Sequence, residues 1–174
     1  MIQEKVKICQ KCDLCITRKN AVPGKGNQNA DVIFIGEAPG KSEDLSGEPF
    51  IGIAGKILND ALENAGLTRN DVYITNIVKC RPPKNRIPNE IEKTSCSNYL
   101  EDEIVIINPK IICLLGNTSF YSILGGKEIS KNHGKFVFKD NRMYFVTFHP
   151  AATIYNQKLG KVFKNDIKKL MKEL

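Results

Sequence analysis

Two patterns of apolar residues alternate along this 174-residue chain. Short continuous apolar runs, which are typical of buried β-strands, occur at residues 31–35, 72–78 and 110–115. Residues 135–147 predict a hairpin that turns at Asp140-Asn141, and its second arm is the last core strand. Helical spacing and capping residues predict helices at 54–65, 89–105, 119–124 and 160–174.

Strands that alternate with helices favour a parallel sheet with helices on both faces. We therefore expect a three-layer α/β sandwich with a central four-stranded parallel sheet, built as a single domain over residues 1–174. The carboxyl ends of parallel strands meet at one edge, where open α/β folds bind ligands. Three candidate loops fall at that edge, namely Gly36–Phe50, Asn76–Asn89 and the segment that starts at His149.

The loop that follows the first strand, Gly36–Phe50, is the most informative segment (GEAPGKSEDLSGEPF). Its glycines and proline leave backbone N–H groups at the sheet edge, and Glu37 adds a carboxylate. Lys41-Ser42 follows Gly40, but only three residues separate Gly36 from Gly40 where the phosphate-loop signature has four, so the loop lacks that signature. A nucleoside triphosphate is therefore not expected, whereas a smaller planar ligand such as a base could lie against Phe50.

Composition places the chain among ordinary globular proteins, with 41% hydrophobic and 26% charged residues. The net charge of +7 is compatible with a polyanionic partner such as nucleic acid, and equally with a solvated lysine-rich surface. Residues 1–8 lack the apolar core of a signal peptide, and no apolar run approaches the length of a membrane span. We therefore expect a cytoplasmic protein with reduced cysteines and no membrane partner.

Six cysteines divide into two groups. Cys113 lies inside an apolar strand and is expected in the core. The other five form a C-x-x-C-x-x-C segment near the N-terminus and a distant C-x15-C pair, at positions 9, 12, 15, 80 and 96. Structural zinc usually uses two short C-x-x-C knuckles, whereas iron–sulfur clusters tolerate irregular spacing. A metal centre is favoured over free thiols, and spacing alone does not decide which of the N-terminal cysteines take part.

Polar residues at the strand ends supply candidate chemistry. The carboxamide of Asn76 can donate and accept, so it can pair with two adjacent edge atoms of a base. His149 lies between a strand and Pro150, a position that favours a functional role over a structural one. His133 precedes Gly134 in a polar stretch and is expected to be an exposed loop residue. Basic residues crowd the proline-rich loop beside this edge and predict phosphate contacts, at Lys79, Arg81, Lys84 and Arg86.

Together these segments resemble the family 4 uracil-DNA glycosylases, the thermostable-type iron–sulfur branch of the uracil-DNA glycosylase superfamily. The matching motifs are CQKCDL, GEAPGKSED-x-x-G-x-PF, AGKIL, VYITNIVKCRPPKNRIP, Cys96 and FHPA, in the family's order from Cys9 to Ala151. The resemblance implies removal of uracil from DNA by a monofunctional glycosylase, which leaves an abasic site for base-excision repair. DNA is then the partner, uracil is the product, and a monomer is the natural expectation.

The resemblance also implies a [4Fe-4S] cluster that ties down the N-terminal segment. The family's ligand positions fall on Cys9, Cys12, Cys80 and Cys96, which leaves Cys15 as an additional thiol. We interpret such a cluster as structural. The alternative functions are a metal-stabilised module that binds damaged DNA without cutting it, which does not explain Glu37 or His149, and a redox protein, whose cluster would change oxidation state with function.

Family roles carry over to the loops at the sheet edge. The turn formed by Gly36, Glu37, Ala38, Pro39 and Gly40 would line a uracil pocket through its backbone. Phe50 would stack on the base, Asn76 would read its Watson–Crick edge, and His149 would hydrogen-bond to uracil O2. Glu37 would position water or stabilise the sugar cation, and Glu43 would crowd the C5 position against thymine.

The chain departs from related families at three places. Ala38 stands where several families have a catalytic Asp, and the proline-rich loop has no His that would trap DNA covalently. No lysine lies in the pocket motifs to form a Schiff base, so no strand cut is expected. Thr153, Ile154 and Tyr155 replace the usual Leu-Leu-Arg run, and Ile154 or Tyr155 is expected to fill the gap left by the base.

Overall fold

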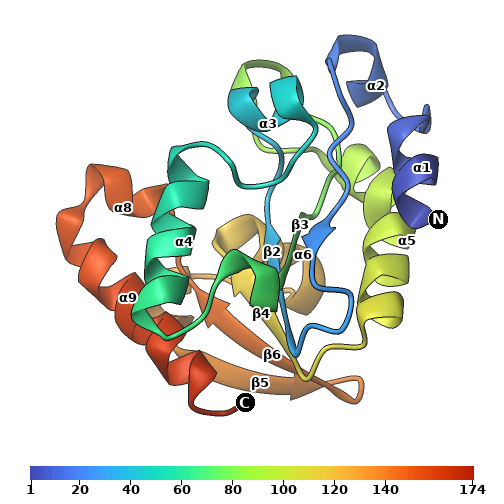
Figure 1. Cartoon of the computed structure of the whole chain (residues 1–174). Coiled ribbons are helices and arrows are strands. Elements are labelled where there is room, and N and C mark those ends of the chain that lie inside the picture. The colour runs from blue at the N-terminus through green and yellow to red at the C-terminus, as the bar shows by residue number, and fades with distance from the viewer.

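The computed structural model describes all 174 residues and contains one six-stranded sheet (Figure 1). The strand order is β1-β3-β2-β4-β6-β5. The strands are β1 (Lys25–Gly26), β2 (Val32–Gly36), β3 (Tyr73–Asn76), β4 (Ile111–Leu115), β5 (Lys135–Lys139) and β6 (Arg142–Thr147). The inner strands β3, β2, β4 and β6 are parallel, and β1 and β5 pair antiparallel at the two edges. The sheet is thus wider than the four strands expected, because antiparallel strands extend a parallel centre.

Helices cover both faces of the sheet (Figure 1). The long helices α4 (Ile53–Asn64) and α9 (Gln157–Met171) lie on one face, and α1 (Ile2–Lys7), α5 (Glu90–Ile107) and α6 (Asn117–Leu124) lie on the other. Successive residues of β2 point to opposite faces, since Phe34 packs with Leu58 and Phe163 while Ile35 packs with Tyr99. The order of layers is therefore that of an α/β sandwich with two apolar cores.

Local signals explain where several elements begin and end. Asn89 caps α5, because its side chain accepts from the N–H of Glu92 (2.9 Å) and the Glu92 carboxylate accepts from the N–H of Asn89 (2.8 Å). Asp140 and Asn141 take left-handed backbone angles (φ 50° and 58°) and close the β5–β6 hairpin. Cys113 is fully buried in β4, which confirms its place in the core.

Short elements account for most of the differences from the expected pattern. The helices α2 (Leu14–Thr17), α3 (Lys41–Ser46), α7 (Ile129–Asn132) and α8 (Ala152–Tyr155) and the 3-10 turns η1 (Arg69–Asp71) and η2 (Pro83–Asn85) interrupt the loops. His133 lies in a turn after α7, as expected, but it is half-buried and not exposed. Its Nδ1 lies 3.0 Å from the Asp166 carboxylate and its ring packs on Phe148. No helix combines the length and the apolar character that a membrane crossing requires.

Candidate active site

A cavity of about 240 Å³ opens at the carboxyl edge of the parallel strands. Three of its residues come from segments far apart in the sequence: Glu37 follows β2, Asn76 ends β3 and His149 follows β6. The lining is formed by Glu37, Ala38, Pro39, Gly40, Glu43, Phe50, Ala54, Asn76, Pro82, Asn85, Arg86, His149 and Ala151. The structure thus brings the predicted site residues together. The volume is below the ~300–1,000 Å³ of sites for drug-sized ligands, so the cavity suits a smaller molecule.

The side chain of Asn76 has an unusual environment. Asn76 is only 1% exposed, and its Oδ1 atom is buried with no hydrogen-bond partner. Strand pairing places Asn76 directly beside Gly36, where an added Cβ would lie 2.5 Å from Oδ1 and 2.5 Å from the Phe50 ring. Only glycine at position 36 therefore permits this approach. A buried acceptor without a partner costs about 1–3 kcal/mol, which a ligand with an N–H donor would recover.

Phe50 forms an apolar wall of the cavity. It is 5% exposed and adopts a left-handed backbone conformation (φ 51°), which is uncommon for a bulky residue. Its carbonyl accepts a hydrogen bond from the Arg69 guanidinium (2.8 Å), and the lack of a side chain at Gly55 leaves room for that carbonyl. The Phe50 and His149 ring centroids lie 5.7 Å apart. A planar ligand between these groups would have an aromatic surface and an imidazole within reach.

His149 is held as a neutral hydrogen-bond donor. Burial lowers the pKa of His149 to about 4, against a small opposing effect of the Glu43 charge. The backbone N–H of Ala151 donates to Nδ1 (3.1 Å), so the ring proton resides on Nε2. The imidazole can therefore donate from Nε2 near neutral pH without carrying a charge itself.

The two carboxylates of the cavity are engaged in different ways. Glu37 is half-buried and accepts a hydrogen bond from the Thr118 hydroxyl on α6, a partner that sequence reasoning missed. Glu43 is buried, and its two oxygens accept backbone N–H groups of Gly40 (3.1 Å), Ile51 (3.0 Å) and Gly52 (2.8 Å). Glu43 therefore ties the turn after β2 to the start of α4. Whether it also excludes a methyl group at C5 stays a prediction.

The proline-rich loop differs from its expected role in DNA contact. Lys79 is 1% exposed and its ammonium is 2.6 Å from the Glu103 carboxylate, so its predicted contact with a DNA phosphate is wrong. Arg86 is paired with Glu92 through both guanidinium nitrogens (2.8 and 2.5 Å). Arg81 donates to the side chain of Asn85 (2.7 Å), while Lys84 is exposed. Lys84 is thus the residue of this loop with the freest charge.

Five cysteines meet beside this loop. Cys9, Cys12, Cys15, Cys80 and Cys96 line one small cavity, whose walls also contain Lys79 and Tyr99. Cys80 and Cys96 are buried, and the other three are half-buried. All five are free thiols in the structure. Segments about 65 residues apart in the sequence thus converge on one sulfur-rich site, as the spacing predicted.

Hydrogen-bond donors surround these sulfur atoms. The Arg18 guanidinium donates to Cys80 Sγ (3.0 Å), and backbone N–H groups of Lys79 and Leu14 face the thiols of Cys96 and Cys12. Such donors are typical of sites that stabilise thiolates bound to metal. No three or more His, Cys, Asp or Glu side chains are arranged to hold a single metal ion.

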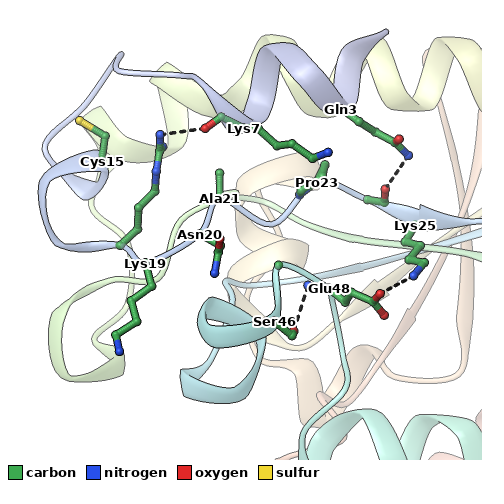
Figure 2. Close-up of a pocket in the computed structure, with 13 residues that line it drawn as sticks. Gln3, Lys7, Cys15, Lys19, Asn20, Ala21, Pro23, Lys25, Ser46 and Glu48 are labelled. Atoms are coloured by element: carbon green, nitrogen blue, oxygen red, sulfur yellow. Dashed lines mark hydrogen bonds and ion pairs between the residues drawn. The ribbon is translucent and has the colours of Figure 1, made fainter.

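A larger cavity of about 660 Å³ lies outside the strand ends, between α1, the segment 18–25 and the end of α3 (Figure 2). Its lining is polar and includes four basic residues, but Lys25 is paired with Glu48 (2.5 Å) and Lys7 with Glu4 (2.9 Å). It contains none of the strand-end residues. We therefore place the chemistry in the smaller cavity, despite the larger volume of this one.

Sequence reasoning missed four residues that line the smaller cavity: Ala54, Pro82, Asn85 and Ala151. Each is close in sequence to a motif that was recognised, and this proximity is the signal that could have found them. Ile154 and Tyr155 lie on α8 directly after the His149 segment, and they are 45% and 91% exposed. That one of them enters DNA stays a prediction.

Comparisons with known proteins agree with the geometry. Residues 23–174 match the family described as the uracil DNA glycosylase superfamily. A type-4 uracil-DNA glycosylase of Saccharolobus solfataricus is 46% identical over 184 residues, which cover 100% of this chain and 85% of that protein. Proteins of the same description from Sulfurisphaera tokodaii and Archaeoglobus fulgidus are 48% and 42% identical, each over 97% of this chain and over 81% and 89% of their own lengths.

Proposed function

This chain belongs to the uracil DNA glycosylase superfamily, and we propose that it is a type-4 uracil-DNA glycosylase that hydrolyses the N-glycosidic bond of deoxyuridine in DNA. The products are free uracil and an abasic site. The observation that carries this function is the buried, unpaired Oδ1 of Asn76 in a base-sized cavity. Uracil offers the N–H donor that this oxygen lacks.

Recognition follows from the edge groups of the base. Uracil N3–H can donate to Asn76 Oδ1, while the amide nitrogen donates to O4. Cytosine presents an amine and a bare ring nitrogen at the same positions, so both contacts would be mismatched. A site built for polar pairing rejects such a mismatch by about 10⁴–10⁵-fold, far more than it rejects a missing methyl group.

The base must leave the duplex before it can enter the cavity. Extrusion costs a few kcal/mol, and it is offset by stacking and hydrogen bonds within the pocket. Phe50 supplies the stacking surface, and its fixed backbone conformation holds the ring in place before the base arrives. Tyr155 and Ile154 are the exposed residues closest in sequence to the His149 segment, and we assign them to the gap left in the DNA.

Bond cleavage separates a uracil anion from a cationic sugar. Nε2–H of His149 faces the cavity as a neutral donor and stabilises the negative charge that develops at O2, an effect typically worth about 3–4 kcal/mol. Glu37, whose position is fixed by Thr118, orients water or stabilises the sugar cation. Neither step needs a covalent intermediate with the protein.

A release assay tests this function. The purified chain is incubated with a single-stranded oligonucleotide that contains one uracil, and free uracil is measured by chromatography. Identical strands with cytosine or thymine at the same position are the matched controls. We expect uracil only from the first strand, which stays uncut until alkali cleaves the abasic site. Binding to the uracil strand without release would instead support a module that only recognises damage.

We assign the cysteine site to a [4Fe-4S] cluster held by Cys9, Cys12, Cys80 and Cys96. The chemistry of the donor set supports this, because these four cysteines, together with Cys15 and the Arg18 guanidinium that donates to Cys80 Sγ, line one cavity. Structural zinc usually uses two short C-x-x-C pairs, whereas fifteen residues separate Cys80 from Cys96 here, a spacing that an iron–sulfur cluster tolerates. Its contribution is to fix the N-terminal segment against the proline-rich loop.

A further inference from the structure

A buried ion pair lies below the candidate active site. The ammonium of Lys79 and the carboxylate of Glu103 are 2.6 Å apart, and their side chains are 2% and 0% exposed. Glu103 lies on α5, and Lys79 lies three residues after the end of β3. Buried ion pairs rarely add net stability, because desolvation of both charges offsets their attraction. A pair at this position therefore points to a role other than stability.

Every hydrogen-bonding group of the pair has a partner. Besides Glu103, the Lys79 ammonium donates to the Thr75 hydroxyl (2.6 Å) and to the backbone carbonyl of Asn76 (2.8 Å). These three acceptors match the three donors of an ammonium group. The second oxygen of Glu103 accepts from the N–H of Gly24 (2.8 Å), and the first also accepts from Thr75. Every donor and acceptor that these contacts involve is thus paired within the network.

The network holds the backbone of Asn76, the residue whose amide faces the base. Within the chain, Asn76 Oδ1 has no hydrogen-bond partner, so hydrogen bonds to that oxygen do not orient the amide. Its orientation depends on where the backbone of Asn76 lies and on its packing against Gly36. Lys79 binds that backbone directly, at the last residue of β3, where the strand ladder ends.

We infer that Lys79, supported by Glu103 and Thr75, is a positioning residue that fixes the Asn76 amide for recognition of uracil. The inference rests on the proposed glycosylase function. Because Glu103 neutralises the ammonium, Lys79 acts through geometry and not by attracting the uracil anion or DNA. A displacement of about 1 Å at a group that contacts the reacting base is enough to reduce a rate by about 100-fold.

The test removes both charges together, so that no unpaired charge stays buried. Lys79→Met combined with Glu103→Leu is compared with the wild type in single-turnover uracil release. We expect the maximal rate to fall by about 10- to 100-fold. The concentration of protein that gives half-maximal rate should change less than threefold, because neither residue contacts DNA. The preference for uracil over cytosine should fall together with the rate.

Two further sets of variants keep the inference testable. Arg142→Met with Glu101→Leu removes a more exposed ion pair, between β6 and the same helix α5, outside the cavity, and should leave all three quantities unchanged. If the buried double variant does not fold, Thr75→Val removes one acceptor of Lys79 and should give a several-fold loss, which Thr75→Ser restores. A folded double variant, or Thr75→Val, with wild-type rate and selectivity would overturn the inference. A wild type that releases no uracil would instead contradict the proposed function.

Discussion

Replacement of Asn76 by Asp is the sharpest test of how the cavity reads a base. The change exchanges one amide nitrogen for an oxygen and leaves the shape of the side chain almost intact. Asn76 is 1% exposed and borders Gly36, so the new group has no room to turn towards solvent. Any effect on selectivity therefore comes from the hydrogen-bonding pattern.

The size of the effect follows from the two contacts that change. Uracil O4 loses its donor and faces a carboxylate oxygen, which leaves two buried acceptors unpaired. At about 1–3 kcal/mol for each unpaired group, the loss is about 3 kcal/mol or somewhat more. Each 1.36 kcal/mol is a factor of ten in rate, so uracil excision should slow by about 100-fold or more. A protonated Asp can donate to N3 of cytosine and accept from its amine, so cytosine excision should rise.

The assay measures single-turnover excision from otherwise identical strands that contain uracil or cytosine. Asn59→Asp is a matched control, because Asn59 Oδ1 is also buried without a partner but lies outside the cavity. The control should keep the wild-type preference for uracil. If Asn76→Asp loses activity on uracil but its ratio of uracil to cytosine rates stays unchanged, the amide does not read the base and the recognition argument fails.

Three further predictions concern the imidazole, the cysteines and the basic loop. Because the pKa of His149 is about 4 in the folded protein and near 6.5 when unfolded, the free energy of unfolding should fall by about 3 kcal/mol from this group as pH drops from 6.5 to 4. His149→Asn can still accept from Ala151, and its free energy of unfolding, measured by denaturant titration at each pH, should fall less steeply between pH 6.5 and 4. The same dependence on pH in the variant and the wild type would contradict the lowered pKa of His149. Cys96→Ser should lose bound iron and the absorbance near ~400 nm, whereas Cys15→Ser should keep about four irons per chain; equal loss in both would refute the assigned ligands. Lys84→Ala should reduce the slope of log affinity for DNA against log salt by about 0.9, because one phosphate contact is lost, and an unchanged slope would exclude that contact.

The arrangement of the main elements was accessible from sequence because its signals are local. The apolar run of β2 and the capping residue Asn89 each depend on a few neighbours, and both predictions are confirmed. By contrast, β1 consists of Lys25 and Gly26, which form a strand only because they pair with β3. A two-residue edge strand of polar character leaves no periodic pattern to detect.

The site shows the same division between local and distant causes. Motif residues such as Phe50 and His149 were found because they follow strands at one edge of the sheet. The burial of Lys79 was missed because it depends on Glu103, 24 residues further along the chain and on another element. In the sequence Lys79 is one basic residue among several, and nothing nearby marks it as paired. A run of charged residues therefore predicts an exposed surface, and the structure is needed to show which of these charges is buried in an ion pair.

The account depends most directly on the contact between Asn76 and a uracil base. A crystal structure of the protein with free uracil measures that contact. We predict that N3 of the base lies within about 3.2 Å of Asn76 Oδ1 and that O2 faces Nε2 of His149, with the ring against Phe50. Uracil bound outside this cavity, or inside it with N3 turned away from Asn76, would contradict the central claim.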